Sequence, residues 1–120
     1  MIVGLGIDIV DMARLGARLD RTPGLRERVF TEAERDLPLR SLAARFAAKE
    51  ATGKALCTPG DLPWQEAEVT KGEHGEPILV VTGAVAARAE LLGVTRLHIS
   101  LSHDGGIATA IVIAESEGAP

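Results

Sequence analysis

The stretch TRLHISLSHDGGIATAIVIA, residues 95–114, contains two β-rich runs joined by a tight turn. The runs at 95–103 and 107–114 carry many β-branched residues, and the Asp-Gly-Gly at 104–106 is typical of a hairpin connection. Two strands joined so closely must run antiparallel, because a parallel pair needs a crossover connection of about a dozen residues or more. The end of the chain therefore predicts an antiparallel sheet.

The rest of the chain alternates between strand and helix patterns. Thr31-Glu32-Ala33-Glu34 has the form of a capping box, which predicts a helix start there. The other predicted elements are a strand at 2–10, helices at 11–21 and 39–57, strands at 64–70 and 77–82 around a turn at 72–75, and a helix at 83–92.

This order predicts an α+β fold, because several strands lie too close together in sequence for crossover helices. We expect a small, mostly antiparallel sheet packed with a long central helix and shorter helices. The 120 residues suit a single domain spanning 1–120.

The composition excludes several classes of protein. Aromatic residues are only 2% of the chain, which argues against a nucleic-acid module built on base stacking. No run of about 20 apolar residues exists that could span a membrane, and the first residues lack the charged region of a secretory signal. A single cysteine, Cys57, excludes an internal disulfide and fits a reducing compartment. We therefore expect a cytoplasmic protein.

Five arginines are concentrated between residues 14 and 28 of a chain whose net charge is −4. Only Asp20 and Glu27 oppose them in that segment. Such a cluster indicates an anionic partner, and the alternative is a solvated helix face. The five are Arg14, Arg18, Arg21, Arg26 and Arg28.

Glu50 is out of place on the helix predicted at 39–57. At about 100° per residue it shares the apolar face with Leu42 and Phe46, where an unpaired carboxylate is costly. Lys54 lies one turn further on, but an ordinary surface pair belongs on the opposite, polar face. Glu50 therefore predicts a bound cation or a buried ion-pair network.

Asp8 presents the same problem in the strand at 2–10. Side chains alternate along a strand, so Asp8 shares its face with Gly4 and Gly6, which leave room for another element or a ligand. The alternative is a cap on the helix that starts near Asp11. The packed face is expected at the odd positions, Val3, Leu5, Ile7 and Ile9.

Together, Asp8 and Glu50 offer hard oxygen ligands without histidine or cysteine beside them. Mg²⁺ commonly takes one or two protein carboxylates, with waters and substrate phosphate oxygens completing its shell. The pair therefore predicts a Mg²⁺ site for a phosphate-bearing substrate.

His103 ends the first of the two C-terminal strands, beside the Gly-Gly turn. A histidine in so accessible a place could bind phosphate or transfer protons, and the alternative is a cap on the strand end. Ser100 and Ser102 are not assigned to a catalytic triad, because sequence neighbours on a strand cannot assemble one by adjacency.

Three segments together resemble one known family. They are GIDIV at 6–10, RFAAKEA at 45–51 followed by Lys54, and ISLSH at 99–103. In this order and spacing they look like the holo-[acyl-carrier-protein] synthases, the short, single-domain branch of the 4′-phosphopantetheinyl transferases. The resemblance spans essentially the whole chain, and Phe-x-x-Lys-Glu-Ala after an early Gly-x-Asp is its most specific part.

The resemblance implies transfer of 4′-phosphopantetheine from coenzyme A to a serine of an apo acyl carrier protein, with release of adenosine 3′,5′-bisphosphate. It implies Mg²⁺ on Asp8 and Glu50 at the pyrophosphate, and a homotrimer with its active sites between subunits. Whether the carrier serves fatty-acid or polyketide synthesis is left open.

The resemblance also implies roles for further residues. Lys54 would neutralise phosphate charge, and Arg45 and His103 would reach the coenzyme A phosphates from a neighbouring subunit. The loop of Gly75 and Pro77 would lie beside the nucleotide. Basic residues for docking the acidic carrier protein would be Arg14, Arg21 and Arg28.

Asp104 stands where relatives commonly have a hydroxyl residue, so its role is open. It would orient His103, act as a base, or do neither. The proton acceptor for the incoming serine is likewise open among Glu50, a metal-bound water and the His103–Asp104 pair.

Two other functions compete with this one. The first is a different Mg²⁺-dependent enzyme, such as a nucleotide phosphohydrolase that uses the same two carboxylates. The second is a non-catalytic module that binds coenzyme A or the carrier protein.

Overall fold

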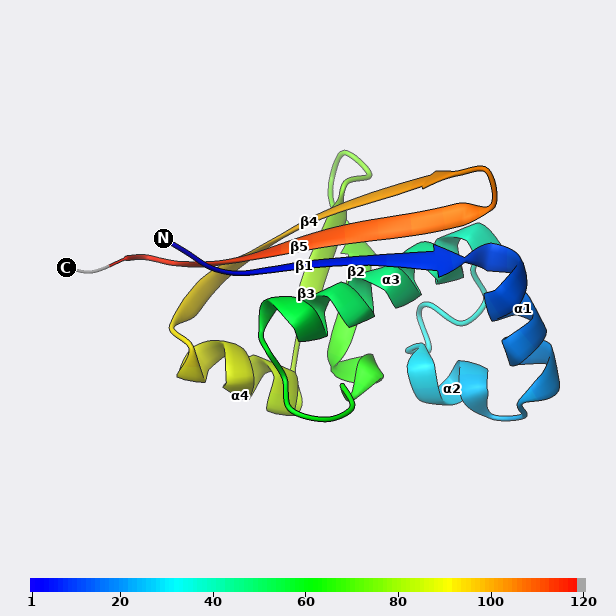
Figure 1. Cartoon of the computed structure of the whole chain (residues 1–120), viewed down its shortest axis with the longest axis horizontal. Helices are drawn as coiled ribbons and strands as arrows, with labels where there is room; N and C mark the ends of the chain where they lie inside the picture. Colours follow the sequence, from blue (N-terminus) through cyan, green and yellow to red (C-terminus); the bar gives the residue numbers. More distant parts are fainter. Residues whose placement is uncertain (119–120) are drawn as a thin grey trace.

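Residues 1–118, which the computed structural model describes, fold into a three-stranded sheet, a separate two-stranded hairpin and four helices (Figure 1). This arrangement confirms the predicted α+β class. The elements are β1 (Ile2–Asp11), α1 (Met12–Arg21), α2 (Leu25–Val29), α3 (Leu39–Ala55), a 3₁₀ turn η1 (Trp64–Glu66), β2 (Ala67–Lys71), β3 (Pro77–Val81), α4 (Gly83–Leu91), β4 (Val94–Asp104) and β5 (Ile107–Ser116).

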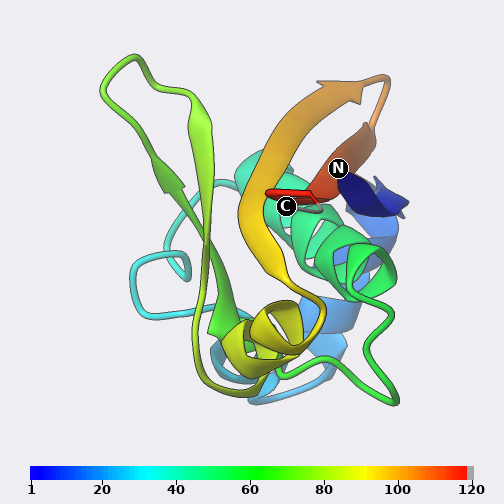
Figure 2. The ribbon, with the colours of Figure 1, turned by 90° about the vertical axis from the view of Figure 1, so that its left-hand side faces the viewer.

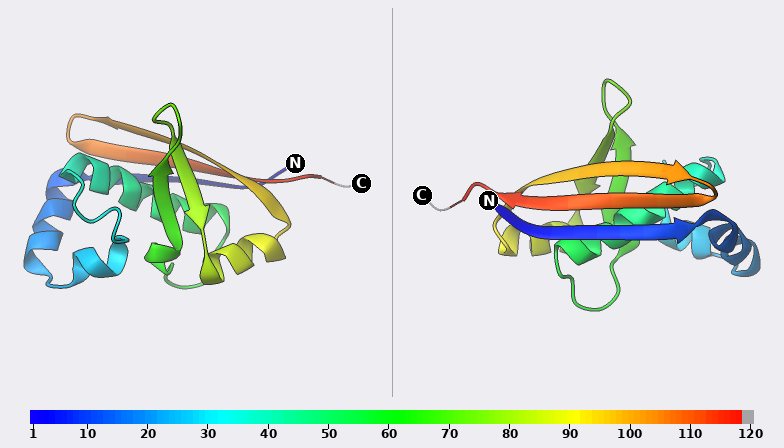
Figure 3. Two further views of the ribbon diagram at one scale, coloured as in Figure 1. Left: turned by 180° about the vertical axis from the view of Figure 1, so that it is seen from behind. Right: turned by 45° about the horizontal axis from the view of Figure 1, so that its top comes forward.

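The three-stranded sheet has the order β1-β5-β4 and is antiparallel throughout. Gly105 and Gly106 connect β4 to β5 with φ angles of 55° and 80°. Two positive φ angles are the signature of a tight hairpin turn whose twist matches that of the strands. β1 pairs with the other side of β5, so β5 lies between the first strand and β4 (Figure 3, right).

Helix α3 lies directly against the backbone of β1. A Cβ atom added to Gly6 would stand 1.8 Å from the carbonyl oxygen of Ala51, and one on Gly4 would stand 1.8 Å from that of Ala55. Only glycine permits this close approach, because any side chain would overlap the helix backbone.

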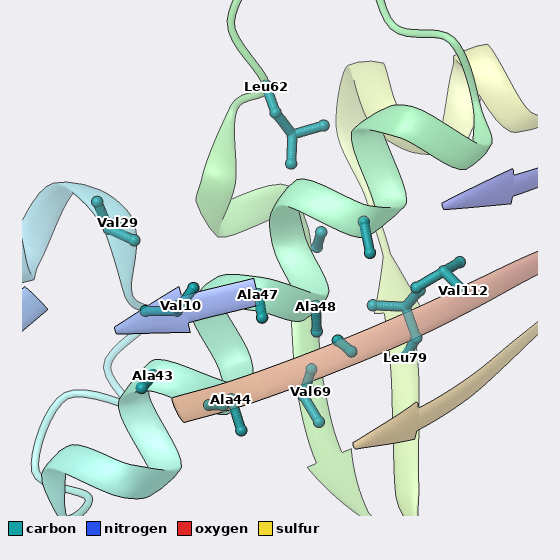
Figure 4. Close-up of a cluster of buried hydrophobic side chains, with 14 of the residues drawn as sticks. Val10, Val29, Ala43, Ala44, Ala47, Ala48, Leu62, Val69, Leu79 and Val112 are labelled. Carbon is teal, nitrogen blue, oxygen red and sulfur yellow. The ribbon is translucent and has the colours of Figure 1, made fainter. Parts of the chain in front are cut away.

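Small side chains fill the layer between α3 and the sheet. Figure 4 shows alanines of α3 beside Val112 of β5 and Leu79 of β3. Because α3 is covered on nearly all sides, it lacks the simple apolar stripe expected for a surface helix. The buried alanines of this helix are Ala43, Ala44, Ala47, Ala48, Ala51 and Ala55.

The prediction for the packed face of β1 is wrong for the single chain. Val3, Leu5, Ile7 and Ile9 are 41–67% exposed, whereas Gly6 and Val10 are buried against the helix layer. The close packing of α3 requires glycine at positions 4 and 6, so these residues face the helix. The side chains of Leu5, Ile7 and Ile9 alternate with them and therefore point to the outer face of the sheet. Ile111 of β5 pairs with Ile7 and extends this apolar outer face.

The region between α1 and α3 differs from the prediction in two ways. The sequence pattern did not predict the short helix α2. No helix follows Thr31; turns occupy residues 32–36. Half of the capping box is nevertheless present, because the Thr31 N–H donates to Glu34 Oε1 at 3.0 Å.

Helix α1 is capped by Asp11, whose Oδ1 accepts from the Arg14 N–H at 2.9 Å. The alternative reading of Asp8 as this cap is therefore wrong. Asp8 lies three residues earlier, within the paired part of β1.

The hairpin of β2 and β3 lies beyond β4 and projects beside the sheet (Figure 2). Its turn closes through a hydrogen bond from the Gly72 N–H to the Glu76 carbonyl at 2.8 Å. Among the residues described, no helix is both long and apolar enough to cross a membrane.

Candidate functional site

Asp8, Lys54 and Glu50 lie along one flank of α3, at the β1 edge of the sheet. The Lys54 ammonium donates to Asp8 Oδ1 at 3.3 Å and to the Ile7 carbonyl at 2.8 Å. Glu50 lies one helical turn before Lys54, at the spacing that brings side chains together. We call these three residues the carboxylate flank.

Glu50 is half-buried and is not at the centre of an apolar face, as the helical spacing had predicted. Helical spacing also places Leu39 and Cys57 on the face of Glu50, and both are exposed. The Glu50 carboxylate is not left unpaired either, because Trp64 Nε1 donates to its Oε1 at 2.7 Å. The free-energy cost of burying the Glu50 carboxylate is thus reduced by a hydrogen-bond donor that lies 14 positions away in sequence.

An open hollow of about 310 Å³ adjoins this flank. Glu50, Lys54 and Trp64 form one side of it, and the loop around Thr58 and Asp61 forms the other. The exposed thiol of Cys57 also lines it. A substrate phosphate in this hollow would meet both a carboxylate and an ammonium group.

The donor set of the carboxylate flank fits Mg²⁺. Within residues 1–118, no group of three or more histidine, cysteine, aspartate or glutamate side chains is placed to hold a metal ion. Two carboxylates with an open approach are what Mg²⁺ uses when waters and phosphate oxygens supply its other ligands. Asp8 already holds one cation, the Lys54 ammonium, so this position stabilises positive charge.

A buried ion pair that the sequence did not predict lies one residue before Glu50. Lys49 is 0% exposed, and its Nζ lies 2.9 Å from Glu34 Oε1. It also donates to the carbonyl oxygens of Trp64 at 3.0 Å and Ala67 at 2.8 Å. Burial lowers the pKa of Lys49, and Glu34 opposes that shift. No pattern in the sequence marks Lys49 as part of a buried pair.

Arg45 lies on the opposite flank of α3. It precedes Glu50 by five residues, which places it about 140° around the helix. Lys49, one turn beyond Arg45, reaches the start of β2, so this flank faces the hairpin side. The Arg45 side chain is 7% exposed, and its Nε has no hydrogen-bond partner among the described residues. Arg45 therefore has a buried donor without a partner among the described residues.

His103 is also remote from the carboxylate flank. Asp8 pairs with Ala110 of β5, and Ala110 pairs with Leu101 of β4, two residues before His103. At about 4.8 Å between neighbouring strands, His103 lies roughly 10 Å across the sheet from Asp8. We call Arg45 and His103 the histidine flank.

Asp104 is next to His103 in sequence but points to the other face of β4, because side chains alternate along a strand. No hydrogen bond joins the two side chains in the part of the chain that the structure describes. The structure therefore brings together Asp8, Glu50 and Lys54, and it does not bring His103 or Asp104 to them.

The remaining predicted residues lie at the surface. Gly75 lies in the turn between β2 and β3, and Pro77 is the first residue of β3. This hairpin lies beyond β4. Arg14 and Arg21 are exposed on α1, and Arg28 is exposed on α2. Arg14 also borders a hollow between β1 and α1.

Comparison with known proteins gives consistent results. A model of the 4′-phosphopantetheinyl transferase superfamily matches residues 4–112. The holo-[acyl-carrier-protein] synthase of Clavibacter sepedonicus is 58% identical over 99% of this chain and 100% of the relative. The solved synthase of Neisseria meningitidis superposes with a TM-score of 0.85 at 30% identity, covering 97% of this chain and 100% of that one. That of Bacillus anthracis, in complex with CoA (3′,5′-ADP), gives 0.79 at 35% identity, covering 98% and 99%.

Proposed function

The chain belongs to the 4′-phosphopantetheinyl transferase superfamily, and from this premise we propose that it is a Mg²⁺-dependent, homotrimeric holo-[acyl-carrier-protein] synthase. It transfers 4′-phosphopantetheine from coenzyme A to a serine of apo acyl carrier protein. The observation that carries the assignment of the site is Lys54, which lines one open hollow together with Glu50 and pairs with Asp8 at 3.3 Å.

In the reaction, the serine oxygen of the carrier protein attacks the phosphorus that bears the pantetheine chain. A new O–P bond forms while the pyrophosphate bond breaks, and adenosine 3′,5′-bisphosphate leaves with the bonding electrons. The serine proton passes to a base. Asp8 and Glu50 would hold Mg²⁺, and the bound ion would stabilise the charge on the attacked phosphoryl group and on the leaving group. Lys54 adds a positive charge beside the phosphates.

The direct test is intact-mass spectrometry of an apo carrier protein after incubation with coenzyme A and Mg²⁺. We expect a gain of one phosphopantetheine mass on the carrier. A nucleotide phosphohydrolase would instead cleave coenzyme A without any carrier, and a binding module would leave the carrier mass unchanged. Either of those results with a competent carrier protein contradicts the proposal.

Two observations support a homotrimer with shared active sites, as the resemblance implies. The outer face of the sheet, which no helix covers (Figure 3, right), exposes Leu5, Ile7 and Ile9. Contiguous apolar surface of this kind marks an interface. The carboxylate flank and the histidine flank lie on opposite sides of α3 and the sheet. In a closed ring, each subunit presents one surface to one neighbour and a different surface to the other. The two flanks of adjacent subunits can then meet.

Mixed trimers of two inactive variants test this arrangement. We expect Asp8→Asn and His103→Ala to be inactive separately, because each lacks one half of every site. In a randomly mixed ring of equal amounts, every trimer containing both variants has one interface with both intact halves, so about a quarter of the wild-type activity should return. Native mass spectrometry would verify that the subunits mix. If mixed trimers stay inactive, each site lies within one chain.

Docking of the carrier protein and cellular location follow from the same proposal. Arg14, Arg21 and Arg28 provide exposed positive charge for an acidic carrier protein, and such complementarity accelerates association. An enzyme that consumes coenzyme A, with one exposed free thiol at Cys57, suits the reducing cytoplasm.

A further inference from the structure

Trp64 makes a direct hydrogen bond to a residue of the carboxylate flank. Its indole N–H donates to Glu50 Oε1 at 2.7 Å, and the two residues are 14 positions apart in sequence. No hydrogen bond within the described residues engages the second carboxylate oxygen, Oε2. The indole therefore occupies one oxygen of Glu50 and leaves the other available beside the hollow.

Trp64 is itself held at two points, one on its backbone and one on its ring. The Trp64 carbonyl accepts a hydrogen bond from Lys49 Nζ at 3.0 Å, and Lys49 is fixed by its buried ion pair with Glu34. The ring packs against Phe46, with 6.3 Å between ring centroids and 43° between ring planes. A donor restrained in this way can fix the direction of a flexible glutamate side chain, which otherwise loses rotamer freedom when it binds a ligand.

We infer that Trp64 is a positioning residue for Glu50, holding its carboxylate so that Oε2 faces the metal and the coenzyme A pyrophosphate. The inference rests on the proposed role of Glu50 as a Mg²⁺ ligand. Hydrogen bonds to metal-ligating groups orient those groups, and losing one typically costs roughly ten- to a hundred-fold in metal affinity or activity.

The test compares the wild type with Trp64→Phe, which keeps an aromatic ring beside Phe46 and removes the N–H donor. Mn²⁺ serves as the probe, and the free ion is counted by electron paramagnetic resonance. We expect the Mn²⁺ dissociation constant of the variant to rise about ten-fold or more. Transfer activity should fall at low Mg²⁺ and recover to within a few-fold at high Mg²⁺. A merely structural role for the ring would not produce recovery with added metal.

A Mn²⁺ dissociation constant within two-fold of the wild type would overturn the inference. If Trp64→Phe does not fold, a closer isostere is available because Trp64 is the only tryptophan. Incorporating the benzothiophene analogue of tryptophan replaces the N–H by sulfur in an otherwise similar ring, and the same rise in dissociation constant is expected.

The outcomes also distinguish this inference from the proposed function. If the wild type modifies the carrier and binds Mn²⁺, but the variant binds equally well, only the role of Trp64 is wrong. If the wild type neither binds Mn²⁺ nor modifies the carrier, the proposed function fails and the inference fails with it.

Discussion

Replacing Asp8 by Asn or Glu50 by Gln is expected to lower the rate of phosphopantetheine transfer at least about a hundred-fold. Each change removes one charged oxygen ligand from a site whose metal stabilises charge on the phosphates by several kcal/mol, and each 1.4 kcal/mol is a factor of about ten in rate. The rate is measured by the mass gain of the carrier protein over time, at several Mg²⁺ concentrations.

A loss of fold is not the expected cause of that effect. The Asp8–Lys54 pair has a lysine side chain that is 56% exposed, and exposed pairs contribute about 0–1 kcal/mol to stability. The melting temperatures should therefore change little. Glu90→Gln, at an exposed position on α4, is the matched control and should keep wild-type activity. Near-normal rates in both Asp8→Asn and Glu50→Gln would contradict the metal site.

Lys49→Met is expected to destabilise the fold by about 3–5 kcal/mol, because it leaves the buried carboxylate of Glu34 without its cation. Glu34 keeps hydrogen bonds from the backbone N–H groups of Thr31 and Val69, which limit the loss. The change also removes the donor to two carbonyl oxygens, those of Trp64 and Ala67. Urea denaturation followed by circular dichroism gives the free energy of unfolding.

The double variant Lys49→Met/Glu34→Gln removes both charges, and it keeps one of the two acceptor oxygens of Glu34 while the other becomes an NH₂ donor. With no uncompensated charge, it should regain part of the lost stability, although the two carbonyl oxygens stay unsatisfied. Lys54→Met removes an exposed lysine of the same length and should change stability by no more than about 1 kcal/mol. The explanation is wrong if Lys49→Met unfolds at the same urea concentration as Lys54→Met.

For the helix that carries Glu50, the sequence pattern predicts where the helix lies in the chain but not which of its faces are buried. Spacing predicted a helix at 39–57, and α3 spans Leu39–Ala55. The same spacing identified only one of the covered faces, because α3 is covered by the sheet on one side and by Trp64 and Leu62 on another. A periodicity of 3.6 identifies one contact face, and it does not describe a helix that is enclosed.

The buried ion pair could be found only in part. Glu34 was noticed as the end of a capping box, and Lys49 belongs to the motif that identified the family. Nothing in the sequence shows that the two side chains meet, since 15 residues and a turn-rich segment separate them. Only one feature of the sequence could have drawn attention to Trp64, which is that it is the only tryptophan in the chain. That signal does not name Glu50 as its partner.

The sequence alone determined the antiparallel hairpin and the α+β class, and it singled out the two carboxylates of the proposed metal site. Those features depend on local chemistry: two glycines with positive φ, alternating side chains, and acidic residues on apolar elements. Tertiary structure decided which face of β1 packs, because both Gly4/Gly6 and Leu5/Ile7 are compatible with burial, and only the approach of α3 selects the glycines.

Tertiary structure also decided how far apart the predicted site residues lie within one chain. The resemblance implies that Arg45 and His103 approach Asp8 and Glu50 from a neighbouring subunit, but it does not say how one chain separates the two groups. The strand order β1-β5-β4 places a full strand between Asp8 and His103, and the helix turns Arg45 away from Glu50. No local pattern contains that separation, because strand order is set by long-range pairing.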